Sequence, residues 1–439
     1  MKRTIAIIMC ALFLLGATSL LAHTRRQIVQ VHLEAVEQQV LEQFFRSAPD
    51  ILSQDRKSKT VDVLCSESDL RFFRDLGLDV SIIIENADDY ARQLREIDYL
   101  KRFHTFDEML QEMQAAHSAN PQLTQLVDIG DSYDKTVGRG GYDIWVIKIS
   151  DNAAIEEDEP EVFFMANMHA REIITPEIIL NFMHYLLDNY GYDPYVTHLV
   201  NNREIWLCPT FNPDGHEYVF SGTNLNNYGD PLWWRKNKRD NNGNGSFDPY
   251  YDGVDLNRNF GYAWGNNNGS SPNPTSETYR GPAPFSEPEN QAIRDFVIQH
   301  NFLITLSFHS YSQLWLYPWG FTSAHTPDHQ IFVALADCCV AYNDYEPDTG
   351  YGLYPVSGDT DDWFYGEQEV KNKIYAFTPE VGSGREGHPL AMGYGFHPDT
   401  SYIEKQISEN LGPQLYMAYA AGEEPIIVSS PLADTENSA

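Results

Sequence analysis

Residues 161–176 read EVFFMANMHAREIITP, and the order of apolar and polar residues in this segment organises the interpretation of the whole chain. The short apolar run from Glu161 to Asn167 predicts a buried strand. Thr175 and Pro176 predict the start of a helix, with Thr175 as its N-cap and Pro176 at the first helical position. The string His169-Ala-Arg-Glu172 therefore lies between the end of a strand and the start of a helix, where open α/β sheets place their functional sites.

A third candidate metal ligand, His309, follows in the segment Phe308-His-Ser-Tyr311. Two imidazoles and one carboxylate are a ligand set for Zn²⁺ that leaves the fourth tetrahedral position open, as catalytic zinc sites do. His184 lies within a predicted helix and is interpreted as an ordinary polar side chain. The sequence thus predicts a zinc site formed by His169, Glu172 and His309.

The chain from about Phe103 onward alternates predicted strands with predicted helices, which is typical of an α/β fold. We expect a mixed central sheet with helices on both faces. The segment from Gly222 to Gly281 is a long loop rich in Asn, Gly, Pro and Tyr, and long loops in compact domains are usually functional. The predicted elements are Phe106–Ser118, Leu126–Ile129, Tyr142–Ile149, Glu161–Asn167, Ile178–Asn189, Glu204–Thr210, Pro288–Gln299, Leu303–Phe308, Ile331–Asn343, Lys373–Phe377 and Ser401–Ala421.

The first hundred residues have a different organisation. Lys2 and Arg3 precede an apolar stretch that ends near Ala22, so residues 1–22 are predicted to be a secretory signal peptide; an uncleaved membrane anchor is the competing interpretation. Residues 23–98 predict a small α+β domain, interpreted as a propeptide, with strands at Gln27–Leu33, Val61–Leu64 and Val80–Ile84. Residues 103–421 form the main domain, and residues 422–439 a polar C-terminal tail.

The net charge of −33 makes a nucleic-acid partner improbable, because phosphate binding needs a basic surface. We expect a monomer that is secreted or periplasmic and has no stable membrane association once the signal peptide is removed.

The main domain resembles the zinc carboxypeptidases of the carboxypeptidase A, B and T type, and within them bacterial carboxypeptidase T most. The resemblance rests on eight motifs in order: His169-Ala-Arg-Glu172, Asn212-Pro-Asp-Gly215, Trp234-Arg-Lys-Asn237, Asp255-Leu-Asn-Arg-Asn259, Ser276-Glu-Thr-Tyr-Arg-Gly281, His309-Ser-Tyr-Ser-Gln313, Tyr354 with Asp362-Trp363, and Thr378-Pro-Glu380. It implies hydrolysis of the last peptide bond of peptides and proteins with a free C-terminus.

The resemblance also implies roles for individual residues. Zinc-activated water would attack the peptide bond, with Glu380 as general base. Arg235 would stabilise the oxyanion. Asp255 would orient His169, although a loop-capping role is as good an interpretation. The residues that would bind substrate are Arg171, Asn257, Arg258, Tyr311 and Tyr354, of which Asn257 and Arg258 would hold the terminal carboxylate.

Substrate preference is predicted from Asp359 and Asp361, which fall where related enzymes place specificity residues. Two buried acids would attract the side chains of Lys or Arg. The alternative is that one or both acids form turns. The sequence therefore predicts a preference for basic C-terminal residues with some breadth.

A calcium site is a further expectation. Carboxylates cluster before the first metal-bearing strand, and hard oxygen ligands at this density can bind Ca²⁺. In carboxypeptidase T the matching acidic segment does so. A solvated acidic turn is an equally good interpretation for any one residue. The candidate ligands are Glu157, Glu159, Glu161 and Glu204.

Two other functions stay open at this point. One is an amidohydrolase that acts on acylated amino acids or cell-wall peptides with the same metal ligands. The other is a binding domain that has the fold but no activity. The carboxylate-binding residues oppose the first, and Glu380 with the three intact metal ligands opposes the second.

Overall fold

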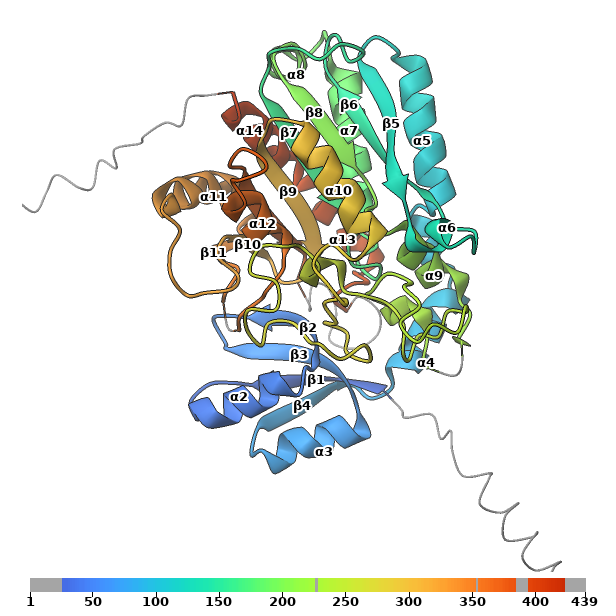
Figure 1. The fold of residues 1–439 in the computed structure, drawn as a ribbon, viewed down its shortest axis with the longest axis vertical. Helices are drawn as coiled ribbons and strands as arrows, with labels where there is room; N and C mark the ends of the chain where they lie inside the picture. Colours follow the sequence, from blue (N-terminus) through green and yellow to red (C-terminus); the bar gives the residue numbers. More distant parts are fainter. Residues whose placement is uncertain (1–25, 226–227, 353, 384–393, 423–439) are drawn as a thin grey trace, which may run out of the picture.

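The computed structural model describes residues 26–225, 228–352, 354–383 and 394–422. The predicted signal peptide and nearly all of the predicted C-terminal tail lie outside these ranges. The described chain forms an N-terminal unit with a four-stranded sheet and a larger C-terminal unit with an eight-stranded sheet (Figure 1). Within the described ranges, no helix has both the length and the apolar character that a bilayer span requires.

The N-terminal unit is an antiparallel sheet in the order β2-β3-β1-β4, with two helices on one face. Val29, Val61 and Val63 pack against Phe44 and Phe73 of those helices. The predicted small α+β domain is therefore present. Its elements are β1 Arg26–His32, α2 Gln38–Arg46, β2 Asp50–Asp55, β3 Thr60–Ser66, α3 Glu67–Asp75 and β4 Asp79–Ile84.

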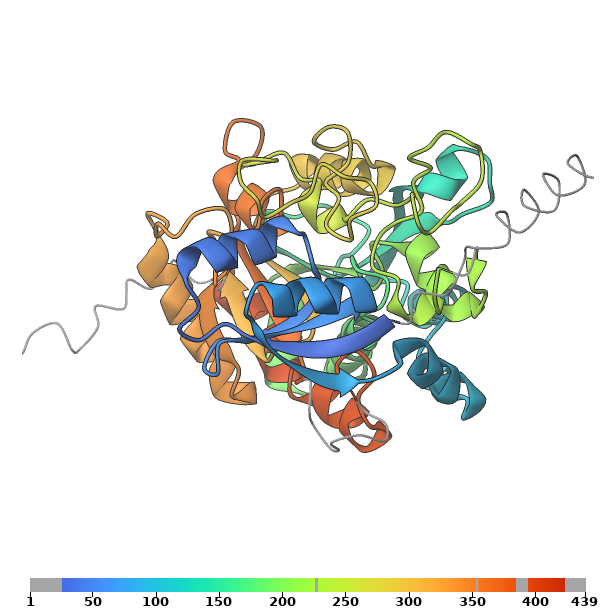
Figure 2. The same cartoon turned by 90° about the horizontal axis from the view of Figure 1, so that it is seen from below.

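The opposite face of this sheet packs on the C-terminal unit. Ile28, Leu52 and Leu64 belong to the large core cluster of that unit. Seen from below, the N-terminal unit lies across one end of the larger unit (Figure 2). The connection between them consists of α4 Ala87–Glu96 and the 3₁₀ turn η1 Tyr99–Arg102.

The eight-stranded sheet has the order β11-β10-β12-β9-β7-β8-β6-β5 and is mixed. Its centre, β12-β9-β7-β8, is parallel, whereas β10, β6 and β5 are joined through antiparallel pairs. The strands are β5 Thr124–Asp131, β6 Asp143–Ile149, β7 Glu161–Ala166, β8 Glu204–Cys208, β9 Phe302–Ser310, β10 Leu314–Tyr317, β11 Glu346–Thr349 and β12 Tyr375–Val381.

Helices cover both faces of this sheet, as predicted. Along β7, Val162 and Phe164 face one core cluster, and Phe163 and Met165 face the other, because successive side chains of a strand point to opposite faces. The helices are α5 Phe106–Ala119, α6 Tyr133–Thr136, α7 Thr175–Asn189, α8 Pro194–Val200, α9 Pro213–Ser221, α10 Pro288–Gln299, α11 His329–Asn343, α12 Thr360–Gly366, α13 Thr400–Ser408 and α14 Leu411–Ala420, with 3₁₀ turns η3 Pro231–Trp233 and η4 Leu256–Arg258.

Three local expectations were wrong. The single helix predicted at Ser401–Ala421 is two helices, α13 and α14. Helix α7 begins at Thr175, and its N-cap position is Ile174. The hydroxyl of Thr175 instead donates to the carbonyl of Glu172 at 2.9 Å and accepts from the amide of Asn167 at 3.0 Å, so it braces the preceding loop. The strand predicted at Lys373–Phe377 is shifted to Tyr375–Val381, which places Glu380 within the strand.

Candidate active site

The three predicted metal ligands meet at the carboxyl ends of two adjacent parallel strands. His169 and Glu172 lie on the loop after β7, and His309 lies near the end of β9. His169 Nδ1 is 2.7 Å from Glu172 Oε1, and His309 Nδ1 is 3.0 Å from both Glu172 Oε2 and His169 Nδ1. All three side chains are buried and converge on one point, so this group can hold a metal ion. Two imidazole nitrogens and a carboxylate fit Zn²⁺.

The outer nitrogen of each imidazole has its own partner. His169 Nε2 lies 3.2 Å from Asp255 Oδ1, and His309 Nε2 lies 3.2 Å from the hydroxyl of Ser307. A proton held on Nε2 by these acceptors leaves the Nδ1 lone pair for a metal. Ser307 was not singled out from the sequence, because a serine within a strand carries no distinguishing signal.

Asp255 is surrounded by positive charge. Burial alone would raise the pKa of Asp255, but Arg235, Arg258 and His169 hold that pKa well below its usual range. Arg235 donates to Asp255 Oδ2 from Nε at 3.0 Å and from a terminal nitrogen at 2.9 Å. Asp255 is therefore ionised, and it holds both a candidate metal ligand and a guanidinium next to the metal group.

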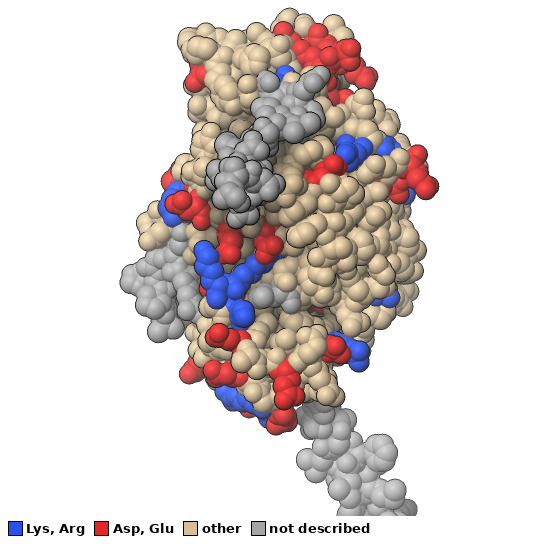
Figure 3. All heavy atoms as spheres, turned by 90° about the vertical axis from the view of Figure 1, so that its left-hand side faces the viewer, with Lys and Arg blue, Asp and Glu red and all other residues tan. Residues whose placement is uncertain are grey.

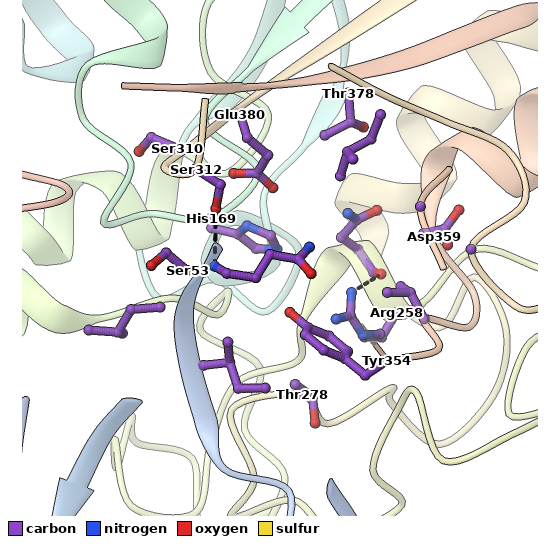
Figure 4. A pocket seen from close by; sticks show the side chains of 18 of the residues that line it. Ser53, His169, Arg258, Thr278, Ser310, Ser312, Tyr354, Asp359, Thr378 and Glu380 are labelled. Carbon is purple, nitrogen blue, oxygen red and sulfur yellow. Dashed lines mark hydrogen bonds between the residues drawn. The ribbon is translucent and has the colours of Figure 1, made fainter. Parts of the chain in front are cut away.

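Glu380 is the direct neighbour of His309 across the sheet. The two residues are register partners on the parallel strands β12 and β9. Burial, together with the charge of Glu172, raises the pKa of Glu380 to about 7, although His309 acts in the opposite direction. Figure 4 shows the Glu380 carboxyl group pointing into the pocket that His169 also lines. A carboxyl group with this pKa can accept and return a proton near neutral pH.

Arg258, Asn257 and Tyr354 line the same pocket. Figure 4 shows Arg258 and Tyr354 side by side, away from His169 and Glu380. Arg258 Nε donates to the carbonyl of Gly269 at 2.7 Å, and its Nη1 donates to the carbonyl of Asn257 at 2.8 Å. The Asn257 side-chain oxygen accepts from the amide of Thr360 at 3.0 Å. These bonds fix a guanidinium and an amide in the wall of the pocket, where a carboxylate could bind.

Three acids around the start of α12, at positions 359, 361 and 362, differ in environment. Asp359 Oδ1 accepts from the amide of Asp362 at 2.8 Å and so caps the helix. Asp362 accepts from the amides of Gly320 at 2.8 Å and Phe321 at 3.0 Å. Asp361 Oδ1 is buried with no hydrogen-bond partner. Burial raises the pKa of Asp359 to about 6 and that of Asp361 well above its usual range.

The N-terminal unit enters this pocket. Residues 49–54, which include most of β2, line it together with the residues described above. Asp50 accepts from both terminal nitrogens of Arg171, and the amide of Gln54 donates to the hydroxyl of Ser312 at 3.2 Å. The ring of Phe45 lies 5.3 Å from that of Tyr354. Arg171 and Tyr311 are wholly buried in this arrangement, and none of these contacts was predicted.

The predicted calcium ligands are only partly brought together. Glu157 and Glu159 group with Asp151, and their carboxylates could hold a cation. Glu204 instead pairs with Lys148 at 2.6 Å, and Glu161 pairs with His300 at 2.7 Å. Asp151 was not among the predicted ligands.

Charged pairs also join the two units. Figure 3 shows basic and acidic side chains close together on one side of the molecule. Arg56 pairs with Asp348, and Lys57 Nζ lies 3.4 Å from Glu346 Oε2. The basic turn between β2 and β3 thus lies against the acidic edge strand β11.

Comparisons with known proteins agree with this geometry. The family described as zinc carboxypeptidase matches residues 109–412. A zinc carboxypeptidase of Saccharothrix mutabilis subsp. capreolus is 31% identical over 407 residues, which are 85% of this chain and 85% of that protein. Carboxypeptidase B of Astacus astacus is 33% identical over 289 residues, which are 64% of this chain and 86% of that protein.

The fold is also shared with solved structures. Carboxypeptidase A from Helicoverpa armigera has a TM-score of 0.76 and 23% identity, covering 91% of this chain and 98% of that chain. That coverage of this chain cannot be reached without part of the N-terminal unit. The chain belongs to the zinc carboxypeptidase family, and it is a metallocarboxypeptidase that acts on peptides at their C-terminal end.

Proposed function

We propose that this protein is a secreted metallocarboxypeptidase, made as a precursor, in which Glu380 is the general base and the preferred C-terminal residues are basic. The observation that carries the proposal is that Glu380 adjoins His309 in register while Asn257, Arg258 and Tyr354 line the same pocket. A proton acceptor and a carboxylate-binding wall thus lie on either side of the space where the last peptide bond would be placed.

Glu380 would take a proton from the attacking water and pass it to the leaving amine. Zinc, when held by His169, Glu172 and His309, supplies a Lewis acid for the carbonyl and the water. Arg235 would stabilise the negative charge that develops on the carbonyl oxygen. Its guanidinium is already oriented by Asp255, so it needs no large rearrangement when substrate binds.

The terminal carboxylate of the substrate would bind to Arg258 and Asn257. A guanidinium offers paired donors that match the two oxygens of a carboxylate. Tyr354 lies beside them and would cover the bound residue (Figure 4). The dependence on a free carboxylate would make the enzyme an exopeptidase.

The preference for basic residues would depend on Asp361 more than on Asp359. Asp359 has a structural hydrogen bond as the cap of α12, whereas Asp361 Oδ1 is buried and without a partner. A buried carboxyl oxygen without a partner is costly, and a Lys or Arg side chain in the pocket would supply that partner.

The N-terminal unit would keep the precursor inactive. Its strand β2 lies in the pocket, and Phe45 packs on Tyr354, the residue expected to cover the substrate. Arg171 and Tyr311, expected to contact substrate further from its C-terminus, are buried while the unit is in place. Removal of residues up to the connector would open these positions.

A calcium ion would bind at the group formed by Asp151, Glu157 and Glu159. One oxygen of Glu157 and one of Glu159 are buried without a hydrogen-bond partner, and burial beside Glu157 raises the pKa of Glu159 to about 7. A cation would supply the partner that these oxygens lack. Such a site would agree with the proposed likeness to carboxypeptidase T, whose matching acidic segment binds Ca²⁺. Added Ca²⁺ should raise the melting temperature of the protein, and Glu159→Gln should remove that rise.

One assay tests the central proposal. A peptide with a free C-terminus and the same peptide with a C-terminal amide are compared with and without a zinc chelator, with the N-terminal unit removed. Hydrolysis of the free peptide alone, abolished by the chelator, is the expected result. Cleavage of the amidated peptide at an equal rate would favour an amidohydrolase instead, and no hydrolysis of either would favour a binding domain.

A further inference from the structure

Asn237 joins the segment that carries Arg235 to the segment that carries Asp255. Its backbone amide donates to the carbonyl of Val254 at 3.0 Å, and its side-chain oxygen accepts from the amide of Val254 at 2.8 Å. Both polar backbone groups of Val254 are therefore held by one residue. Val254 directly precedes Asp255, the carboxylate that contacts His169 and Arg235.

The amide nitrogen of the same side chain is anchored on the opposite side. Asn237 Nδ2 donates to Glu287 Oε2 at 2.8 Å and to Glu289 Oε2 at 3.1 Å. All three side chains are fully buried. Glu287 and Glu289 stand at the start of α10, so the amide is tied to the end of a packed helix.

Little positive charge lies next to Glu287 and Glu289. Arg239 reaches Glu287 Oε1 at 3.1 Å, whereas Glu289 Oε1 accepts from the backbone amide of Tyr133 at 2.8 Å. Burial, with the charges of Glu287 and Asp214, raises the pKa of Glu289 to about 8. Asn237 provides a neutral donor to both acids and an acceptor towards the amide of Val254.

We propose that Asn237 is a positioning residue for the hydrolysis reaction, which acts by fixing Val254 and hence the carboxylate of Asp255 against Arg235 and His169. This inference rests on the proposed roles of Arg235 and Asp255. It predicts that a variant of Asn237 has a lower kcat and retains zinc less well. The reason is that one carboxylate, that of Asp255, orients both the guanidinium of Arg235 and the candidate metal ligand His169.

The test uses Asn237→Asp, which keeps the shape of the side chain but removes the donor and places a carboxylate oxygen against Glu287 and Glu289. In the enzyme that is folded as the full chain and then cut at the connector, kcat should fall about tenfold or more and KM should change less than about threefold. Zinc should also be lost faster to a chelator. The swap variant Asn237→Asp/Glu289→Gln returns one donor to the pair and should restore kcat to within about threefold of the parent.

The matched control is Asn241→Asp in the same loop. The Asn241 amide also braces backbone carbonyls, those of Tyr251 at 3.1 Å and Gly253 at 2.9 Å, but it contacts no carboxylate through its Nδ2. This variant should keep kcat and zinc retention even if it lowers the melting temperature. A general loss of loop stability would affect both variants alike.

The possible results distinguish a wrong role for Asn237 from a wrong role for Arg235. Arg235→Gln is measured in parallel, and an unchanged kcat there would remove the proposed role of Arg235. A folded Asn237→Asp enzyme with kcat and zinc retention near the parent values, beside a weakened Arg235→Gln, would overturn this inference alone. If Asn237→Asp does not fold, the swap variant decides: parent-like kcat supports the inference, and a folded swap variant that stays tenfold slower overturns it.

Discussion

The carboxylate of Asp50 accepts hydrogen bonds from both terminal nitrogens of Arg171, at 3.0 and 2.8 Å. The two residues belong to different units, and Arg171 is separated from the candidate metal ligands His169 and Glu172 by at most one residue. The Arg171 side chain is fully buried and that of Asp50 is 12% exposed, so the pair is shielded from solvent and salt. This pair ties the N-terminal unit to the wall of the active-site pocket.

Replacing Asp50 by alanine should therefore increase the activity of the full-length precursor. Removing one partner of a buried ion pair costs about 3 kcal/mol or more, and here that cost falls on the docked state of the N-terminal unit. We expect about a tenfold rise in the hydrolysis of a short peptide, measured without any processing. Glu42→Ala is the control, since Glu42 forms an exposed pair with Arg46 in the same unit. A precursor that stays as inactive as the parent would remove Asp50 from the inhibitory contact.

The general-base role of Glu380 predicts a large loss in Glu380→Gln. The amide cannot accept a proton, so kcat should fall by about 10²- to 10⁴-fold, while zinc content and KM stay near the parent values. A protonated Glu380 cannot accept a proton, so kcat/KM of the parent should fall as the pH drops through the pKa of Glu380, which is about 7 without a cation and is lowered by a bound one.

The control for this variant is Glu369→Gln, an exposed position on the loop before β12. Retention of more than about a tenth of the parent kcat in Glu380→Gln would show that another group accepts the proton.

Much of the fold was predictable from the sequence, because its central strands are short and apolar. The pattern EVFFMA of β7 and the apolar Phe302–Phe308 part of β9 identify buried strands by composition alone. Strand β2 (DILSQD) was missed, since only Ile51 and Leu52 are apolar and a bulge interrupts its pairing with β3. Edge strand β11 (EPDT) was missed for a similar reason: proline and acids disfavour a strand, and only pairing with β10 makes it one.

The candidate site, like the fold, was predictable only in part. Residues within local motifs, such as His169 and Glu172, were found because they lie only three positions apart in the sequence. Ser307 was not singled out, and Asn237 stood at the end of a motif without a predicted role, because their importance depends on partners that approach from other segments. The docking of Asp50 on Arg171 spans 121 positions of sequence, and no periodicity encodes such a contact.

Substrate preference should depend on Asp361. A C-terminal Arg or Lys would pair with this buried carboxyl group, so Asp361→Ala should lower kcat/KM for a peptide ending in Arg by about a hundredfold. A matched peptide ending in Leu should be cleaved equally well or better, because the variant no longer has a buried carboxyl oxygen without a partner. The measurement is the ratio of kcat/KM for the two peptides in the parent and the variant.

Asp348→Ala, assayed after removal of the N-terminal unit, is a suitable control, because Asp348 is not among the pocket-lining residues and its partner Arg56 belongs to that unit. Equal rates for the Arg and Leu peptides in the parent enzyme would remove the basic preference altogether.

The stability of the protein should depend on pH through His104, which lies just after the connector. Its two ring nitrogens are each 2.8 Å from a carboxylate oxygen, one of Glu112 and one of Glu177. Hydrogen bonds donated to both carboxylates raise the pKa of His104 from 6.5 to about 10, and hydrogen bonds from His104 and His184 lower the pKa of Glu112 from 4.5 to about 2. The raised histidine pKa contributes stability that is complete below pH 6.5 and is lost as the pH rises through 10. The lowered carboxyl pKa contributes stability that is complete above pH 4.5 and is lost as the pH falls through 2.

His104→Gln should therefore lower the melting temperature by a few degrees between about pH 4.5 and 6.5, and by progressively less towards pH 10 and towards pH 2. Thermal unfolding of the parent and the variant across this range measures the difference. His198→Gln is the control, because the ring of His198 is exposed and pairs with the amide of Asn202 instead of a carboxylate. A parent–variant difference that is constant with pH would mean that His104 contributes through packing and not through its charge.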